Sequence, residues 1–277
     1  IKELREGRVG EGFQILDDLQ AIREVKNDDE RSAKVAQDYI TLLEQKRSAL
    51  IVSPTHQEAN KVTKEIRDRL REKNTLKDNE KPVYQQVNKY WGEGTKSDPT
   101  SYSTGDILQF AKPATGFKIG DRVEITGSHK EGSVPYRFLD GREQKAEIPL
   151  DKPDRFQVYR QREINIATGE RIRITQGGSL PNRYRLENGS FHTVKKVNEN
   201  GEMELSNGVV MPKHWGNFNY AYVATSYASQ GKTVDEVLIS QSSDSFPASS
   251  REQFYVSSSR GRENLRIYTD SKEDLLN

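Results

Sequence analysis

The tripeptide Gly231-Lys232-Thr233 is the first place in the sequence where residue types suggest nucleotide chemistry. In a phosphate-binding P-loop, the same G-K-[ST] ending follows another glycine five positions earlier, and the backbone amides between them wrap the phosphates. That position holds Ser226, and the acids of Asp235-Glu236 precede a predicted strand, whereas metal-binding acids would follow one. The sequence therefore predicts that this chain carries no complete nucleotide site of its own.

Thr225 and Ser226 form a second polar cluster, at the end of a strand predicted over residues 220–224. The carboxyl ends of parallel strands are the edge at which α/β sheets bind ligands. Two hydroxyls there, with backbone amides that open a short helix, suit a DNA phosphate on one side and a nucleotide phosphate on the other. The alternative is an ordinary helix cap, which these residues by themselves favour. The amides would come from Ser229, Gln230 and Gly231.

Composition excludes several other chemistries. The 277 residues include no Cys, which excludes disulfides, Cys-ligated zinc, iron–sulfur clusters and thiol catalysis. The four His lie far apart, without H-x-H or H-x-x-x-H spacing, so we expect no metal site. No apolar run reaches the roughly 18 to 20 residues that span a bilayer, and we expect no membrane insertion. The histidines are His56, His129, His192 and His214.

The first residues, Ile1–Glu6, contain neither an initiator Met nor an apolar signal core. We interpret them as the interior of a longer polypeptide, and we expect a cytoplasmic location because no targeting signal is recognisable. The net charge is +1, yet residues 151–200 hold ten bases against six acids. Screening limits the range of each charge's electrostatic interaction to roughly 8–10 Å at physiological salt. This segment can therefore bind phosphates although the chain is nearly neutral overall. A solvated surface is the alternative.

The first seventy residues are predicted to form two helices, a strand and a third helix. Apolar residues recur at helical spacing within 13–22 and 35–43, and the short apolar run 49–53 is typical of a buried strand. Pro54-Thr55-His56 follows at once, and then an amphipathic helix through 59–70. A strand, a tight turn and a helix begin a parallel α/β unit.

Between residues 74 and 214 the pattern changes to polar alternation with frequent Gly. Three segments, 105–110, 120–125 and 169–174, each begin with Gly and an acid and then alternate with period two. This is typical of short antiparallel strands with one wet face. We interpret the stretch as one or two small β-barrel or meander modules.

The α/β pattern resumes in the last sixty residues, with strands predicted over 220–224, 236–240 and 265–269 and a helix over 251–259. With the strand at 49–53 this gives four candidate parallel strands. We therefore predict an α/β fold made of a discontinuous parallel-sheet domain and an inserted all-β module. The predicted bounds are 1–73 with 215–277 for the first and 74–214 for the second.

Two segments resemble conserved motifs of superfamily 1 DNA helicases. Residues 222–238 (Tyr-Val-Ala-Thr-Ser-Tyr-Ala-Ser-Gln-Gly-Lys-Thr-Val-Asp-Glu-Val-Leu) resemble the fifth motif, T-x-H-x-x-Q-G-x-T. Tyr227 replaces the usual His and could stack on a base. Residues 254–269 resemble the sixth motif, in which a helix delivers an Arg toward ATP on the neighbouring domain. Residues 51–70 look like the strand and helix that open the same second RecA-like domain.

The sequence Ser-Arg-Gly-Arg-Glu, followed by Ile-Tyr-Thr-Asp-Ser-Lys-Glu, is most similar to the helicase part of conjugative relaxases of the TrwC/TraI type. RecD-like helicases are close relatives. The resemblance covers residues 48–70 and 218–277 and extends more loosely through 156–175. It implies a RecA-like parallel-sheet domain that carries a small SH3-like barrel as its insert.

The resemblance implies that Arg260 is an arginine finger, which would neutralise charge developing on the γ-phosphate and is worth roughly 10³ to 10⁵ in rate in other systems. Arg262 and Arg251 lie on or near the same predicted helix, and the alternative interpretation of these two residues is that they form surface ion pairs. Nucleotide contacts are implied for Gln230, Gly231, Lys232, Arg260 and Arg262. DNA contacts are implied for Thr55, His56, Thr225, Ser226, Tyr227, Ser229, Arg171 and Arg173, with Asn60 a weaker candidate.

For the basic β region the resemblance implies an accessory module that grips single-stranded DNA. Arg171 and Arg173 lie on the polar face of an alternating strand, and four aromatic residues are interleaved with the basic ones. A cationic groove with stacking aromatics binds single strands with little sequence preference. Each aromatic taken singly is more typical of a barrel core. The four are Tyr159, Tyr184, Phe191 and Trp215.

We therefore expect a fragment of an ATP-dependent helicase from a conjugative relaxase, which binds single-stranded DNA and completes the ATP site of an absent first domain. ATP and Mg²⁺ would be cofactors of the full-length parent, with none bound to this fragment, which we expect to be inactive alone. Its partners would be the relaxase and first helicase domains and the coupling protein of a type IV secretion system. The alternatives are a non-catalytic translocation-signal module recognised by that system and a RecD-like repair helicase fragment.

Overall fold

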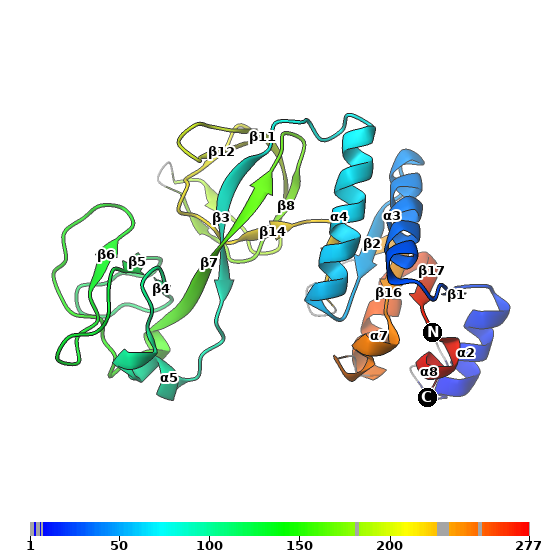
Figure 1. Ribbon diagram of the computed structural model, residues 1–277, viewed down its shortest axis with the longest axis horizontal. Coiled ribbons are helices and arrows are strands. Elements are labelled where there is room, and N and C mark those ends of the chain that lie inside the picture. Colours follow the sequence, from blue (N-terminus) through cyan, green and yellow to red (C-terminus); the bar gives the residue numbers. More distant parts are fainter. Residues whose placement is uncertain are drawn as a thin grey trace. The chain divides into compact units, whose positions relative to one another are not determined.

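The computed structural model describes Glu3, Glu6 and residues 8–180, 183–225, 233–248 and 251–276. The chain folds as two units. The first contains residues 1–78 and 220–277, and the second contains residues 79–219. In Figure 1, the blue and the orange to red segments from the two ends of the chain together form the first unit. Both boundaries lie five residues after the predicted ones at 73/74 and 214/215.

A five-stranded sheet organises the first unit, in the order β1-β17-β16-β2-β15. Every neighbouring pair of strands is parallel. Most residues of the central strand β16 are buried, as expected of a parallel strand covered on both faces. The strands are β1 (Ile22–Glu24), β2 (Ala49–Val52), β15 (Val223–Ala224), β16 (Val234–Ser240) and β17 (Gly261–Thr269).

The structure corrects two expectations about these strands. The apolar spacing predicts one helix over 13–22, but α2 (Val9–Asp18) ends earlier and Ile22 pairs with Ile267 of β17. A strand of three residues is too short to be distinguished by periodicity from the last turn of a helix. The second correction concerns Asp235 and Glu236, which lie inside β16 and not before it.

Helices cover both faces of this sheet. Tyr268 donates a hydrogen bond to Asp38 of α3 at 2.6 Å, so α3 lies on the face toward which Tyr268 points. Its neighbour Ile267 points to the opposite face, because side chains alternate along a strand. There it joins a core with Phe13 and Leu16 of α2, against which α7 and α8 also pack. The helices are α3 (Asp28–Glu44), α4 (His56–Glu72), α7 (Arg251–Ser258) and α8 (Lys272–Leu276), and η3 (Ser243–Ala248) is a 3-10 helix.

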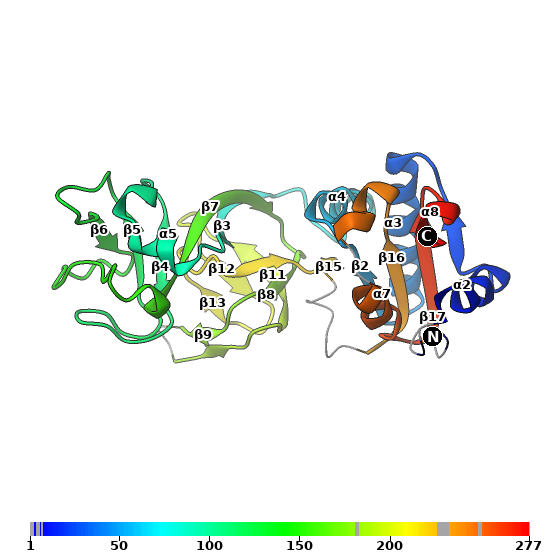
Figure 2. The ribbon, with the colours of Figure 1, turned by 90° about the horizontal axis from the view of Figure 1, so that it is seen from below.

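The second unit contains two antiparallel five-stranded sheets, in the orders β3-β7-β4-β5-β6 and β13-β12-β11-β8-β14. Figure 2 shows the strands β4 to β6 apart from the group β8, β11, β12 and β13. The first sheet contains β3 (Lys81–Asn88), β4 (Ile107–Phe110), β5 (Arg122–Ile125), β6 (Tyr136–Phe138) and β7 (Phe156–Ile166). The second contains β8 (Arg171–Ile174), β11 (Phe191–Val197), β12 (Met203–Leu205), β13 (Val210–Met211) and β14 (Phe218–Tyr220). The remaining elements are α5 (Glu93–Ser97), η1 (Pro99–Ser101), η2 (Pro153–Arg155), β9 (Gly178–Ser179) and β10 (Arg185–Leu186).

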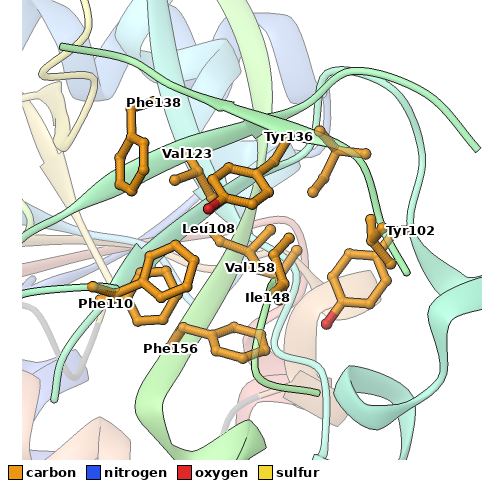
Figure 3. Packing of buried hydrophobic residues seen from close by; sticks show 12 residues of the cluster. Tyr102, Leu108, Phe110, Val123, Tyr136, Phe138, Ile148, Phe156 and Val158 are labelled. Atoms are coloured by element: carbon orange, nitrogen blue, oxygen red, sulfur yellow. The ribbon is translucent and has the colours of Figure 1, made fainter. Parts of the chain in front are cut away.

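An aromatic cluster forms the core beneath the first of these sheets (Figure 3). The rings of Phe110 and Phe117 stack with their centroids 4.1 Å apart, and Phe156 and Tyr136 pack around them. The antiparallel strands predicted over 105–110 and 120–125 are confirmed as β4 and β5. The SH3-like form of the insert stays a prediction.

Glu236 is a fully buried carboxylate in the middle of the parallel sheet. It pairs with Arg47, from the turn before β2, and with Arg266 of β17 at 2.9 Å. The neighbouring Asp235 accepts hydrogen bonds from the backbone N–H and the hydroxyl of Ser48, at 2.8 and 2.6 Å. These contacts set the register between β2 and β16, strands that are far apart in the sequence.

Replacing Glu236 tests how far the sheet depends on this charge. We expect Glu236→Ala to lower the free energy of unfolding by about 3–5 kcal/mol, because it leaves two partly buried arginines without their carboxylate. Glu263→Ala is the matched control: Glu263 also pairs with Arg47, but its side chain is 58% exposed. Its loss should cost at most about 1 kcal/mol. Urea unfolding of both variants would contradict this account if the two losses were equal.

Candidate functional site

The carboxyl ends of all five strands lie along one edge of the parallel sheet. Thr225 directly follows β15, and Thr55 follows β2 by three residues. The two turns are neighbours, since the backbone N–H of Ser53 donates to the carbonyl of Ala224 at 3.0 Å. The structure therefore brings Thr55 and Thr225, two of the predicted DNA-contacting residues, to the same edge.

Thr55 is the N-cap of α4, and its hydroxyl oxygen accepts the backbone N–H of Glu58 at 3.3 Å. The Thr-x-x-Glu spacing is that of a capping box, in which the Glu side chain would return to the N-cap amide. Here the carboxylate of Glu58 instead accepts hydrogen bonds from the hydroxyls of Ser240 at 2.8 Å and Ser53 at 3.3 Å. The hydroxyl of Thr55 keeps its own proton to donate to a ligand.

A small pocket of about 80 Å³ opens beside Thr55 at this edge. Its walls come from the first turns of α3 and α4 and from the segment after β16. Two helix N-termini and several hydroxyl groups therefore meet around it. The lining residues are Asp28, Arg31, Ser32, Thr55, Gln57, Glu58, Lys61, Ser242, Asp244 and Ser245.

Arg31 is the buried cation of the pocket, with 2% of its surface exposed. Its guanidinium donates to the carbonyl of Val25 at 3.0 Å and to the carboxylate of Asp28, and it lies 3.8 Å from the carboxylate of Glu58. Lys61 approaches Asp28 from α4, at 2.9 Å. Asp28 therefore bridges two cations that come from different helices.

The two carboxyl groups of the pocket have opposite pKa shifts. Hydrogen bonding from Lys61, with a further contribution from Arg31, lowers the pKa of Asp28. Burial raises the pKa of Glu58, because desolvation outweighs its hydrogen bonds and the nearby charge of Arg31. The side chain of Asp28 is 51% exposed, whereas that of Glu58 is 8% exposed.

This arrangement offers hydrogen-bond donors to a small anionic group, although three carboxyl groups, those of Asp28, Glu58 and Asp244, line the pocket with the two cations. The amino ends of helices attract anions, and Asn27 caps α3 through hydrogen bonds from the backbone N–H groups of Asp29 and Glu30. Arg31, Lys61 and the Thr55 hydroxyl supply charged and neutral donors in the same place. The carboxylate of Asp28 already occupies the position between the cations that an incoming anion would take.

Several predicted site residues cannot be placed at this edge. Ser226, Tyr227, Ser229, Gln230, Gly231 and Lys232 lie outside the described residues. His56, by contrast, directly follows Thr55 at this edge as the first residue of α4 and is exposed, and Asn60 on the same helix is exposed as well.

Arg260 lies at the opposite, amino edge of the sheet, in the turn between α7 and β17. Its carbonyl accepts the N–H of Val234 at the start of β16, and its Nε donates to the carbonyl of Val256 at 2.9 Å. Arg262 is exposed and pairs with Asp235 at 2.5 Å. A seven-residue strand spans roughly 20 Å, so these arginines and Thr55 serve different surfaces of the unit.

In the second unit, Arg171 and Arg173 share one face of β8. Phe191 of β11 lies directly opposite Arg173 in the ladder, and Thr193 lies opposite Arg171. Arg171 and Phe191 are exposed, and partial burial lowers the pKa of Arg173. Two of the four predicted aromatics, Tyr184 and Phe191, are exposed, whereas Tyr159 and Trp215 are buried.

Sequence reasoning missed most of the pocket. Thr55 was recognisable from the turn that it follows, and the Thr55-x-x-Glu58 spacing was a signal for the helix start. Nothing in the sequence marks Arg31 or Lys61, because their meeting depends on how α3 and α4 pack. Among the described residues, no cluster of three or more His, Asp or Glu could hold a metal ion. No helix in that same part of the chain is long and apolar enough to cross a membrane.

Comparison with known proteins gives matches to solved structures. No protein-family model and no curated protein matches the chain. A double mutant of Pif1 helicase from Bacteroides is 14% identical, with 98% of this chain and 47% of that chain covered and a TM-score of 0.28. Pif1 helicase from Candida albicans is 12% identical, with coverages of 86% and 50% and a TM-score of 0.27.

A third structure, Bacteroides Pif1 helicase in complex with ADP-AlF3 and single-stranded DNA, is 13% identical, with coverages of 90% and 50% and a TM-score of 0.24. The structural neighbours are thus Pif1 helicases of superfamily 1, at low identity. The chain spans about half the length of these solved structures.

Glu58 offers a test of the pocket's electrostatics. A raised pKa means that this carboxyl stabilises the fold fully below the ordinary value of 4.5, and that the contribution is lost as the pH rises through its folded pKa. Glu58→Gln keeps a hydrogen-bonding group and removes the charge. We therefore expect its stability relative to the parent chain to rise between pH 4 and pH 8, as measured by urea unfolding.

Glu65→Gln is the matched control, because Glu65 lies on the same helix, is 32% exposed and is 3.8 Å from Arg69. It removes one negative charge from α4 without removing a buried carboxyl. A Glu58→Gln stability difference that does not change with pH would show that burial does not control this carboxyl.

Proposed function

We propose that this chain is a DNA-binding fragment of an ATP-dependent superfamily 1 helicase, and that the pocket beside Thr55 binds a backbone phosphate of single-stranded DNA. The observation that carries the proposal is the meeting of the Thr55 hydroxyl, Lys61 and buried Arg31 at the carboxyl edge of a parallel sheet. The motif resemblance of residues 222–238 and 254–269 supports the same function.

Phosphate would bind by replacing Asp28. The ion pairs of Asp28 with Lys61 and Arg31 hold both cations in place, and the exposed carboxylate can rotate into solvent. A phosphate oxygen accepts the same charge-assisted hydrogen bonds, and the Thr55 hydroxyl can donate another. Because one anion replaces another, the net gain is small, which fits contacts to a strand that must be released repeatedly.

The second unit would extend the DNA-binding surface. Arg171, Arg173 and Phe191 lie on one face of the β8–β11 ladder. Cations beside an exposed ring are the combination that holds a single strand with little sequence preference. We propose that this face, within an SH3-like insert, also contacts single-stranded DNA.

Nucleotide hydrolysis would need a first motor domain with its own P-loop, and ATP with Mg²⁺ would supply the phosphoryl group whose transfer drives the motor. In this chain, Arg260 is the residue that would reach the γ-phosphate, with Arg262 beside it. Arg260 now donates to the carbonyl of Val256, a neutral partner that a phosphate can displace. Gln230, Gly231 and Lys232 are proposed as further nucleotide contacts on the grounds of the motif alone.

We further propose that the longer polypeptide is a conjugative relaxase of the TrwC/TraI type, because the sequence Ser-Arg-Gly-Arg-Glu resembles that family. The proposed partners are then single-stranded DNA, the relaxase and first helicase domains and the secretion coupling protein. The coding sequence upstream of Ile1 tests this assignment, because a relaxase has its catalytic Tyr and His cluster there. A parent with a helicase domain alone would instead favour the RecD-like repair helicase.

Two lysines of α4, one inside the Thr55 pocket and one outside it, test the proposed phosphate site. We expect Lys61→Gln to weaken binding of a thymidine oligonucleotide several-fold and to reduce the slope of log K against log salt by about 0.7, the value for one lost phosphate contact on a single strand. Lys64→Gln is the control, because Lys64 is 75% exposed and pairs with Asp68 outside the pocket. Fluorescence anisotropy over a salt series measures both quantities.

Asp28→Asn should change the affinity for the oligonucleotide in the direction opposite to Lys61→Gln. Removing the competing carboxylate should strengthen oligonucleotide binding, whereas a purely structural pocket would lose stability without gaining affinity. Equal effects of the Lys61 and Lys64 variants would contradict the proposed phosphate site.

Arg260 is tested in a longer polypeptide that includes the first motor domain. Arg260→Ala should lower the DNA-stimulated rate of ATP hydrolysis by roughly 10³-fold or more, while binding of single-stranded DNA is unchanged. Arg262→Ala, which removes the ion pair with Asp235, should change the rate far less. Normal hydrolysis with lost DNA export would favour the translocation-signal module instead.

A further inference from the structure

A large cleft in the second unit lies beside β4 and β5 and shares no lining residue with the Thr55 pocket. Its volume is about 640 Å³, within the range of small-molecule sites. One wall comes from β4, β5 and the turn between them, and the other from the segments around β9 and before β14. The residues used below are Ile119, Arg122, Arg185, His214 and Trp215, all of which line it.

Arg122 is a buried cation without a counterion. Only 8% of its surface is exposed, and its guanidinium donates to the carbonyls of His214 at 3.1 Å and Trp215 at 2.9 Å. It also lies 4.5 Å from the centre of the Trp215 ring. Burial lowers the pKa of Arg122 to about 10, and no carboxylate in the described part of the chain pairs with it. An uncompensated buried charge is costly, and an anion beside it recovers part of that cost.

The acids of the cleft do not fill this role. Asp121 and Asp140 both pair with Arg142, the latter at 3.3 Å. Arg142 can offset only one of these two carboxylates. Arg185 adds an exposed cation at the cleft wall. Arg122, Arg142 and Arg185 therefore outnumber the two acids, and the formal charge around the cleft is positive.

Trp215 packs closely against the backbone of Gly178. A Cβ atom placed on Gly178 would lie 2.8 Å from the ring carbon Cη2 of Trp215, so the ring edge packs directly on glycine backbone. The indole Nε1 and the Nε of Arg122 are both buried without a hydrogen-bond partner. One of these two unmatched donors belongs to the charged guanidinium itself, so an acceptor-rich group beside this wall would face a charge that no carboxylate in the described part of the chain offsets.

Apolar side chains lie beside the charged wall. Phe110, Leu139 and Leu180 line the cleft, and Ile119 is 69% exposed at its surface. A ligand that fits this combination carries an anionic group at one end and an apolar or ring-shaped body at the other.

We propose that the cleft beside β4 and β5 binds an organic phosphate of nucleotide size, with its phosphate held by the charge of Arg122 and its body against Ile119 and Leu139. The site is separate from the Thr55 pocket and does not depend on the proposed helicase function. A free nucleotide and a nucleotide within a single strand carry the same chemistry, and the experiment below distinguishes them.

The test uses the full chain and three probes in calorimetry: dTMP, thymidine and inorganic phosphate. We expect dTMP to bind more tightly than either part alone, because the site needs both the anion and the body. Trp215 fluorescence in a Trp91→Phe background gives a second readout near the site. Equal binding of thymidine and dTMP would overturn the proposal, and so would the failure of both dTMP and a thymidine oligonucleotide to bind.

Ile119 allows a test of charge that leaves the core intact. Ile119→Asp and Ile119→Lys both remove the same exposed apolar side chain and place charges of opposite sign there. We expect dTMP affinity to be about tenfold lower with Asp than with Lys, the size of a nearby unit-charge effect at a protein surface. Equal affinities in the two variants would exclude an anion site.

An oligonucleotide series with the same variants identifies the source of the phosphate. If dTMP binds with this sign dependence, the site takes free nucleotides. If only the oligonucleotide shows it, the phosphate belongs to a strand, and the anion site stands. Lys61→Gln, which weakens the Thr55 pocket, should leave the Ile119 effect unchanged, so failure of either site is seen separately.

Discussion

The pairing of Arg47 and Ser48 with Asp235 and Glu236 is the contact on which the first unit depends. It joins a segment that precedes the 141-residue second unit, 79–219, to one that follows it. Closing a loop of that length costs conformational entropy, although the cost grows only slowly with length. Parallel pairing supplies hydrogen bonds, but slanted ladders of apolar strands specify register weakly. A buried carboxylate that must meet two arginines removes that freedom, because any slip of β16 against β2 leaves charges buried and unpaired.

The Thr55 pocket inherits its geometry from this register. Ser240 at the end of β16 reaches Glu58 at the start of α4 only because β16 lies directly beside β2. Glu58 in turn lies near Arg31, and Arg31 fixes Asp28 between itself and Lys61. The chain of contacts therefore runs from a structural carboxylate in the sheet to the cations at its edge. Residues that are far apart in the sequence become one site through the strand order of the sheet and the packing of α3 on α4.

That dependence explains how far the sequence could predict the structure. The apolar runs at 49–53, 236–240 and 265–269 predicted three strands correctly, because buried parallel strands have a strong local signal. Strand β1 had no such signal and forms through its pairing with Ile267. Thr55 was predictable from its turn, but Arg31 was not, since its burial follows from the packing of α3 on α4. Among the aromatics of the second unit, Trp215 is buried and Phe191 is exposed, and the sequence could not tell them apart. A period-two pattern predicts which residues share a face of a strand, but not what packs against that face.

Arg31 and Arg122 show what a buried guanidinium can do under two conditions. Arg31 lies within ion-pair distance of two carboxylates, so an incoming phosphate exchanges with Asp28 and gains little net energy. Weak, reversible contacts of this kind suit a surface that must release a strand as readily as it binds one. Arg122 has only carbonyl oxygens and an aromatic ring as partners, so an anion beside it displaces no charge. The same residue type therefore favours exchange at the parallel sheet and retention in the cleft, and the difference follows from whether a carboxylate is already there.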